Sequence, residues 1–246
     1  HYYFFMPNTY INGCIVNIPF NINALYQLFS PIMAQKLEEK LIKKYGFGSN
    51  ISLLTLMKNT DKDIKFIAEY IYEYVFKNYS VKQWELEPKK IDSSVIERVP
   101  IRINKDNRYF LDKYQGIPLN GYTKMIENIL SHPKITIKLN TDFDSITEKF
   151  DRIIYTGSID EYFGYKYGKL PYRSLNFETK SDKTIITMEY PRKYEINKNE
   201  RFYPVNNLKN NEIYERYLKE AKQNKGIYFL GRLGNYKYCN MDKIVE

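Results

Sequence analysis

The chain has 246 residues, and its 38 Lys and Arg exceed its 29 Asp and Glu, which gives a formal charge of +9. It contains only two His and two Cys (His1, His132, Cys14 and Cys239), whereas a structural zinc site takes about four such ligands. This composition disfavours a zinc site and catalysis by a Cys–His or Ser–His pair, and no apolar run is long enough to span a membrane.

The start of the chain predicts a β-hairpin followed by a helix. Asn12-Gly13 supplies the positive φ angles that a two-residue turn needs, and the β-forming segments 9–11 and 14–16 flank it. Ser30-Pro31 is typical of an N-cap followed by the first helical residue, and Gly46 of a helix end.

A longer helix is predicted from about Thr60, where Asp63 completes a pattern similar to a capping box. Its apolar residues recur at steps of three and four, and it is expected to end near Asn78. Residues 79–84 are predicted to be irregular. Residues 93–99 predict a short helix that Pro100 stops.

The second half of the chain is expected to be richer in strands. A helix over 121–131 precedes His132, which is interpreted as a residue of a surface loop. The predicted elements that follow are an alternating strand, a buried strand, an antiparallel pair, a helix and a last strand, at 135–139, 152–157, 172–179 with 184–190, 210–223 and 226–231.

This order of elements predicts a mixed α/β (α+β) fold. We expect a helical domain over residues 21–100, inserted into a sheet-rich body formed by residues 1–20 and 101–246, in which most of the sheet is antiparallel. Two Cys without an obvious disulfide partner, and no start typical of a secretory signal, favour the cytoplasm.

The positive charge and the aromatic residues indicate what the protein binds. The Lys residues are dispersed, as on the helix that carries Lys36 and Lys40, which favours a solvated face over a nucleic-acid patch. The few Arg residues suit bidentate contacts to a diphosphate. The chain has 25 Tyr, 14 Phe and one Trp, and several lie in polar stretches, as expected of a site for a sugar or a base.

Several short motifs follow one another over nearly the whole chain: Lys82-Gln83-Trp84, Arg98-Val99-Pro100-Ile101-Arg102, Asn107-Arg108-Tyr109-Phe110, Gly121-Tyr122-Thr123-Lys124-Met125, Tyr155-Thr156-Gly157-Ser158-Ile159-Asp160, Tyr172-Arg173-Ser174-Leu175, Glu189-Tyr190-Pro191-Arg192, Tyr203-Pro204 and Gly231-Arg232-Leu233-Gly234-Asn235-Tyr236-Lys237-Tyr238. Each motif alone is weak. Their order and spacing closely resemble the UDP-galactopyranose mutase family.

The resemblance implies a flavoenzyme with a three-part fold: an FAD-binding α/β domain, a helical domain and a mostly antiparallel sheet. Its members interconvert UDP-galactopyranose and UDP-galactofuranose for bacterial glycans such as lipopolysaccharide, capsule or cell wall. The implied chemistry is attack of reduced flavin N5 on the anomeric carbon, loss of UDP, and reclosure of the sugar as a five-membered ring. The resemblance also implies a homodimer that binds UDP-galactose and neither nucleic acid nor membrane.

The resemblance assigns substrate-binding roles to seven residues. Phe76 and Tyr79 match aromatics that cradle the uracil, Ser80 a hydroxyl at the nucleotide, and Trp84 the Trp beside the sugar. The tyrosines that match phosphate ligands are Tyr109, Tyr203 and Tyr238. Packing in the core is the alternative for Phe76 and Trp84.

Two arginines match catalytic positions, Arg98 on a lid that grips the diphosphate and Arg232 near the flavin. The loop at the isoalloxazine ring matches Asn240, Met241 and Asp242, and Phe143 matches a contact to the FAD adenosine. Arg173 matches a structural residue or one at the edge of the site. Glu189 matches a carboxylate near the site, with a salt bridge within the sheet as the open alternative.

The chain also departs from the family. It has no Gly-x-Gly-x-x-Gly fingerprint for a dinucleotide, Asn240 replaces an Asp, and a family segment between Phe177 and Thr184 that carries a second lid arginine has no counterpart. A flavin-free UDP-sugar-binding module, or an inactive fragment of the enzyme, is therefore the main alternative. A different FAD-dependent, oxidase-like protein that shares only the fold is another.

Overall fold

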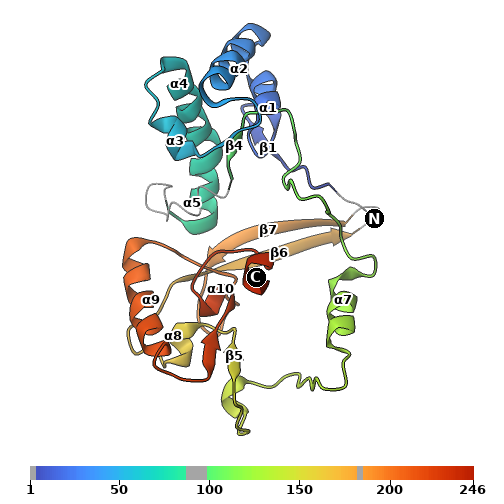
Figure 1. Cartoon of the computed structure of the whole chain (residues 1–246), viewed down its shortest axis with the longest axis vertical. Coiled ribbons are helices and arrows are strands. Elements are labelled where there is room, and N and C mark those ends of the chain that lie inside the picture. Colours follow the sequence, from blue (N-terminus) through green and yellow to red (C-terminus); the bar gives the residue numbers. More distant parts are fainter. Residues whose placement is uncertain (1–3, 87–98, 182–184) are drawn as a thin grey trace. The chain divides into compact units, whose positions relative to one another are not determined.

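The computed structural model describes residues 4–86, 99–181 and 185–246 (Figure 1). Contacts group the chain into two compact units: His1–Ala68 with Val99–Lys149, and Glu69–Arg98 with Phe150–Glu246. We refer to them as unit 1 and unit 2 and describe each by itself. Helices and small sheets occur in both units, so the predicted mixed α/β class is confirmed. The predicted domain boundaries remain a prediction.

Unit 1 begins with the predicted hairpin, formed by β1 (Asn8–Ile11) and β2 (Cys14–Asn17), in which Thr9 is opposite Val16. Asn12 and Gly13 have φ angles of 47° and 88°, so the turn prediction is confirmed.

The helices of unit 1 follow the hairpin. They are α1 (Ile22–Leu28), α2 (Pro31–Tyr45), the short α3 (Leu53–Met57) and most of α4 (Lys62–Ile71). The limits predicted for α2 are confirmed, because Ser30 is its N-cap and Gly46 follows it with a φ of 84°. Buried Leu25, Leu37 and Leu56 belong to the apolar core of these helices, and β3 (Asn50–Ile51) pairs with β4 (Ile101–Arg102).

Asp61, rather than Thr60, caps the start of α4. Its Oδ1 accepts from the backbone amides of Asp63 and Ile64, at 2.8 and 3.2 Å. The side chain of Asp63 points elsewhere and forms ion pairs with Lys36 and Lys40. The predicted Thr60–Asp63 pairing is therefore wrong, because a carboxylate one residue further along reaches the same orphan amides.

Helical structure continues beyond the predicted end near Asn78. After α4 the chain forms the π-helical turn η1 (Tyr72–Lys77) and then α5 (Asn78–Trp84), so the irregular segment predicted at 79–84 is helical. The sequence from Lys62 to Trp84 contains no Gly or Pro that could break a helix. The helix ends at Glu85, which has a left-handed φ of 56°.

In unit 1, most residues after β4 are exposed. The predicted helix is confirmed as α7 (Gly121–Leu130), but none of its side chains is buried. Residues 135–139 alternate in polarity as predicted, yet they pair with no other strand in the described part of the chain, so the strand prediction is wrong. Residues Phe143–Ser145 form a 3₁₀ turn, η3. His132 lies in an exposed loop, as predicted.

Unit 2 contains a three-stranded antiparallel sheet in the order β7-β6-β8, with β6 at Tyr172–Ser181, β7 at Ile185–Lys193 and β8 at Tyr203–Pro204. Figure 1 shows β6 and β7 side by side, and their antiparallel register confirms the predicted pair. A separate parallel pair joins β5 (Ile153–Tyr155) to β9 (Ile227–Phe229). Ile154 is 65% exposed, so the prediction of a strand buried on both faces is wrong.

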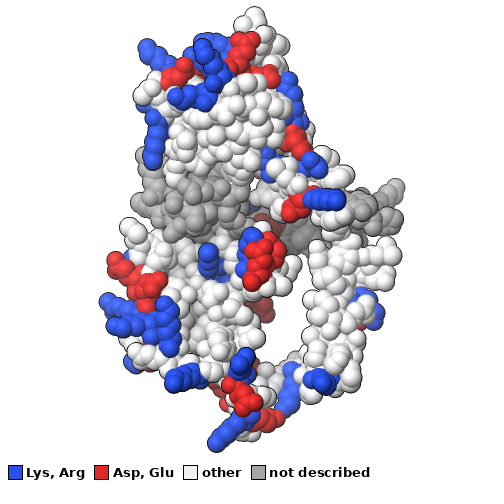
Figure 2. All heavy atoms as spheres, in the orientation of Figure 1, with Lys and Arg blue, Asp and Glu red and all other residues white. Residues whose placement is uncertain are grey.

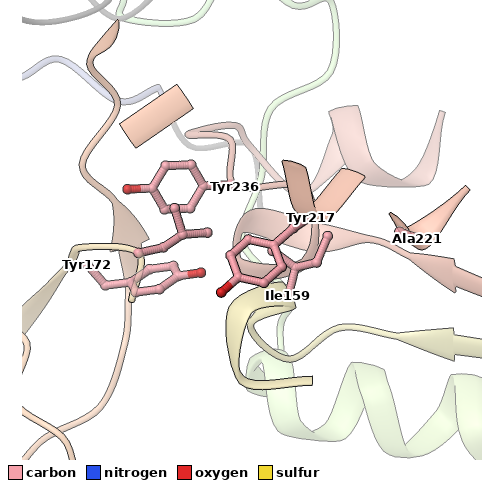
Figure 3. Packing of buried hydrophobic residues seen from close by; sticks show 6 residues of the cluster. Ile159, Tyr172, Tyr217, Ala221 and Tyr236 are labelled. Atoms are coloured by element: carbon pink, nitrogen blue, oxygen red, sulfur yellow. The ribbon is translucent and has the colours of Figure 1, made fainter. Parts of the chain in front are cut away.

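Unit 2 also contains η1 and α5, described above, together with α8 (Ile159–Tyr162), α9 (Leu208–Ala221), α10 (Gly231–Gly234) and α11 (Asp242–Val245). A hydrophobic core cluster of this unit includes Ile159, Tyr172, Tyr217, Ala221 and Tyr236 (Figure 3). The buried hydroxyl of Tyr236 donates to the carbonyls of Pro171 and Val205, at 2.8 and 3.0 Å. These two contacts connect the segment that follows α10 to the residue just before β6 and to the residue just after β8.

None of the helices in the described part of the chain has the length and hydropathy of a membrane span. Figure 2 shows Lys and Arg dispersed among Asp and Glu on the visible face rather than gathered into one stripe, which agrees with the solvated faces predicted from the spacing of the Lys residues.

Candidate functional site

Four of the predicted substrate-binding residues meet in unit 2, and we call them the aromatic cluster: Tyr79, Trp84, Tyr203 and Tyr238. The Trp84 ring lies 5.6 Å from Tyr79, 6.1 Å from Tyr203 and 5.6 Å from Tyr238, measured between centroids. Tyr203 and Tyr238 are 5.3 Å apart. All four contacts are edge-to-face, a favoured geometry for aromatic pairs.

Three segments distant in sequence supply these rings. Helix α5 carries Tyr79 and Trp84, strand β8 carries Tyr203, and the segment after α10 carries Tyr238. Trp84 and Tyr203 are buried, whereas Tyr79 is 49% exposed. Trp84 and Tyr203 thus form a packed hydrophobic core, which agrees with the alternative expected for Trp84, and Tyr79 is the ring of the cluster that reaches the surface.

Arg232 of α10 belongs to the same site. Its guanidinium carbon lies 4.7 Å from the centroid of the Tyr238 ring, and its Nε donates to the carbonyl of Cys239 at 2.8 Å. A cation over an aromatic face is attracted to it electrostatically. The predicted flavin loop follows directly, with Met241 75% exposed and Asp242 at the start of α11.

The backbone around Trp84 is held by the sheet. The carbonyl of Gln83 accepts from Arg173 Nε at 2.9 Å and from the Tyr203 hydroxyl at 3.1 Å. Arg173 Nη1 also forms an ion pair with Glu85 Oε1 at 2.7 Å. Burial is the main cause that raises the pKa of Tyr203, so this hydroxyl stays protonated and continues to donate at neutral pH.

A pocket of about 770 Å³ adjoins Trp84 within unit 2. Trp84, Glu85 and Arg173 line one part of it, and Asp160, Lys169 and Arg201 line other parts. Pockets for small ligands have volumes of roughly 300–1,000 Å³. The pocket therefore has room for a molecule of nucleotide-sugar size.

Buried charge borders this pocket. Asp160 is 1% exposed and accepts from the Leu170 amide at 2.9 Å, and burial raises the pKa of its carboxyl. Arg201 pairs with Glu161 at 2.8 Å and lies over the Tyr194 ring at 4.4 Å. The pocket therefore combines charged groups with the aromatic rings of Tyr172 and Tyr194.

The remaining predicted site residues do not belong to the aromatic cluster. Phe76 in η1 and Ser80 in α5 are buried, at 6% and 3% exposed, on the helical segment that also carries Tyr79. In unit 1, Tyr109 packs against Phe5 at 5.7 Å between ring centroids. Phe143, also in unit 1, is the first residue of η3. Arg98 lies outside the described residues.

Sequence reasoning missed three residues at this site. Gln83 contributes a backbone carbonyl, which leaves no signature in a side chain. Glu85 contributes a left-handed backbone and a carboxylate that forms an ion pair with Arg173, and Arg201 contributes a half-buried cation at the pocket. Among the residues that the structure describes, no group of three or more His, Cys, Asp or Glu side chains is arranged to hold a metal ion.

Comparison with known proteins adds to this geometry. The sequence model of a family described as UDP-galactopyranose mutase matches residues 74–183 and 178–238, a span that includes the whole aromatic cluster and Arg232. Among individual relatives, a probable UDP-galactopyranose mutase of Klebsiella pneumoniae is 30% identical, over 94% of this chain and 69% of its own length. A dTDP-fucopyranose mutase of Escherichia coli is 29% identical, over 95% of this chain and 72% of its own length. A UDP-galactopyranose mutase of Mycoplasma genitalium is 27% identical, over 95% of this chain and 70% of its own length.

Proposed function

This chain belongs to the UDP-galactopyranose mutase family, and from that premise we propose that it is an isomerase that interconverts UDP-galactopyranose and UDP-galactofuranose. The observation that carries the proposal is the convergence of Tyr79, Trp84, Tyr203 and Tyr238, from three separate segments, beside Arg232. A single family motif can arise by chance, but one assembled site built from several motifs supports a shared function.

The side chains of the cluster suit a nucleoside diphosphate sugar. The half-exposed Tyr79 offers a flat ring for the uracil, and Trp84 offers an apolar wall for the sugar. Arg232 and the Tyr238 hydroxyl are suited to the diphosphate, with which a guanidinium can form two parallel hydrogen bonds.

Ring contraction requires that the bond between the anomeric carbon and the diphosphate break and later re-form. In between, the bond from C1 to the 5-oxygen breaks and a bond from C1 to the 4-oxygen forms, so the 4-hydroxyl gives up a proton and the 5-oxygen takes one up. Negative charge grows on the departing diphosphate, so a fixed cation beside it lowers the barrier. In this proposal Arg232 and Tyr238 stabilise that charge, Arg98 adds a second cation, and Trp84 keeps the sugar in place.

FAD is the cofactor that the family implies, and the residues present fit its flavin ring. Arg232 provides a cation for an electron-rich reduced ring, and Asn240, Met241 and Asp242 follow it in the chain, with Met241 exposed. When bound, reduced flavin would supply the nucleophile for the anomeric carbon. The chain contains no Gly-x-Gly-x-x-Gly turn for the diphosphate of FAD, so the proposal assigns only the flavin ring to these residues.

The test uses the full chain, FAD and dithionite as reductant. Conversion of UDP-galactofuranose to UDP-galactopyranose, followed by chromatography of the two sugars, supports the proposal, and Trp84→Ala should abolish it. A colourless preparation that binds UDP and never converts the sugar would favour the flavin-free binding module. A yellow preparation that binds FAD but not UDP would favour the oxidase-like alternative.

A second candidate substrate follows from the Escherichia coli relative, whose identity to this chain differs by one percentage point from that of the Klebsiella protein. Its name gives dTDP-fucopyranose, in which thymine replaces uracil and the sugar lacks the 6-hydroxyl. Direct competition between UDP-galactose and dTDP-fucose for the same preparation decides between them, because the preferred nucleotide sugar displaces the other at lower concentration.

We further propose that the protein is a cytoplasmic homodimer. Light scattering after gel filtration tests the mass of the assembly, and cell fractionation tests the location.

A further inference from the structure

One buried guanidinium contacts the residues on both sides of Trp84, a backbone carbonyl before it and a side-chain carboxylate after it. Gln83 is among the last residues of α5, where a helix leaves its carbonyls without intrahelical donors. Arg173 Nε and the Tyr203 hydroxyl both donate to this carbonyl, at 2.9 and 3.1 Å. Arg173 and Tyr203 are directly opposite each other in the β6–β8 register, so two neighbouring strands hold the same atom.

The residue after Trp84 is held by the same arginine. Glu85 has a φ of 56°, a left-handed conformation that costs free energy for a residue other than glycine and persists where its surroundings maintain it. Its carboxylate forms an ion pair with Arg173 Nη1 at 2.7 Å. We call Gln83, Glu85, Arg173 and Tyr203 the Arg173 clamp.

The fork of the guanidinium suits this double contact. Its nitrogens are fixed in one plane, so Nε and Nη1 can reach the Gln83 carbonyl and the Glu85 carboxylate together. Arg173 is 2% exposed, and charge-assisted hydrogen bonds of a buried group are strong. A lysine at this position has a single ammonium and cannot reproduce the fork.

We propose that Arg173 is a positioning residue, which fixes the direction of the Trp84 side chain in the aromatic cluster by holding the backbone carbonyl before Trp84 and the side-chain carboxylate of the residue after it. The inference rests on the proposed function for the identity of the ligand. The clamp itself can be tested without any ligand, because Trp84 is the only Trp of the chain and its fluorescence therefore reports this site alone.

The experiment compares the wild-type full chain with Arg173→Lys and Glu85→Gly. The glycine variant removes the ion pair but suits the left-handed backbone, and the Glu85 side chain is 61% exposed, so this variant is expected to fold. Arg192→Met is the matched control, since it removes a positive charge from an exposed position of the adjacent strand β7. The measurements are the Trp84 emission maximum, acrylamide quenching, and the dissociation constant of UDP.

We expect a red-shifted emission and stronger quenching in both clamp variants, with UDP bound about tenfold more weakly, while Arg192→Met matches wild type. Wild-type fluorescence in both clamp variants overturns the proposal. So does a changed fluorescence with unchanged UDP affinity, because the position of Trp84 would then not matter for binding. If wild type itself does not bind UDP, the proposed function fails, and the fluorescence comparison still decides whether the clamp holds Trp84.

Discussion

Replacing Tyr217 with Phe removes one oxygen from the core of unit 2 and leaves every ring contact in place. The Tyr217 hydroxyl donates to the Gly168 carbonyl at 2.8 Å and accepts from the Tyr167 amide at 2.9 Å. Its side chain is fully buried, and its ring stacks on Phe163 at 5.9 Å. The substitution therefore leaves one backbone donor and one acceptor without their partner.

The expected cost follows from these two groups. A buried polar group that loses its partner costs about 1–3 kcal/mol, and water is expected to satisfy part of this at the half-buried Tyr167 and at the exposed Gly168, so we expect Tyr217→Phe to lower the free energy of unfolding by about 1–3 kcal/mol. For a chain of this size each 1 kcal/mol lowers the melting temperature by about 2–4 °C.

Urea unfolding followed by Trp84 fluorescence measures this loss, because Trp84 and Tyr217 both belong to unit 2. A lower midpoint with an unchanged slope reports a change of stability rather than of the denatured state. Tyr228→Phe is the control, since Tyr228 is 52% exposed and its loss of a hydroxyl should cost less than about 0.5 kcal/mol. A Tyr217→Phe loss no larger than that of the control would refute the reasoning.

Three further predictions concern the site and the charges. Trp84→Ala and Arg98→Ala should each severely reduce UDP binding or turnover, and near wild-type kinetics in both would contradict the site assignment. Asp61→Ala should cost about 1 kcal/mol in thermal unfolding through loss of the α4 cap, and Asp61→Asn, which can still accept from the amides, should cost less; equal losses would argue against capping. Burial raises the pKa of Asp160 in the folded state, so the contribution of this group to stability is complete below its unfolded pKa and is lost as pH rises through the folded pKa. Asp160→Asn should therefore gain stability relative to wild type as the pH of the urea titration is raised, and a difference that does not change with pH would show that the Asp160 charge is not the cause.

Local signals explain which parts of the fold could be predicted. The Asn12-Gly13 turn and the limits of α2 depend on residues adjacent in sequence, and both predictions were confirmed. Residues 135–139 have the alternation of a strand, but a strand also needs a partner, and pairing depends on residues far away in the chain. Residues 79–84 are helical rather than irregular, because the chain from Lys62 to Trp84 contains no Gly or Pro that would end the helix earlier.

The candidate site likewise has features that motifs could predict and features that depend on residues far apart in the chain. The resemblance named Tyr79, Trp84, Tyr203 and Tyr238 from motifs, but only the register that places Tyr203 opposite Arg173 explains why the sheet meets the end of α5. The Arg173 clamp acts on a backbone carbonyl and on the carboxylate of a residue with a left-handed backbone, and neither that carbonyl nor that conformation is encoded by a residue type in a recognisable pattern.

The π-helical turn at Tyr72–Lys77 has a consequence for how this site can vary. Such a turn holds more residues than an α-helical turn, and one residue corresponds to about 100° of rotation around the helix axis. Tyr79 and Trp84 lie after the turn on the same helical segment. Their phase, meaning the direction of their side chains around the helix axis, therefore depends on how many residues the turn contains. Substitutions in Tyr72–Lys77 leave that phase unchanged, whereas deleting a single residue would rotate both rings together. The length of this turn is therefore constrained more strictly than its composition.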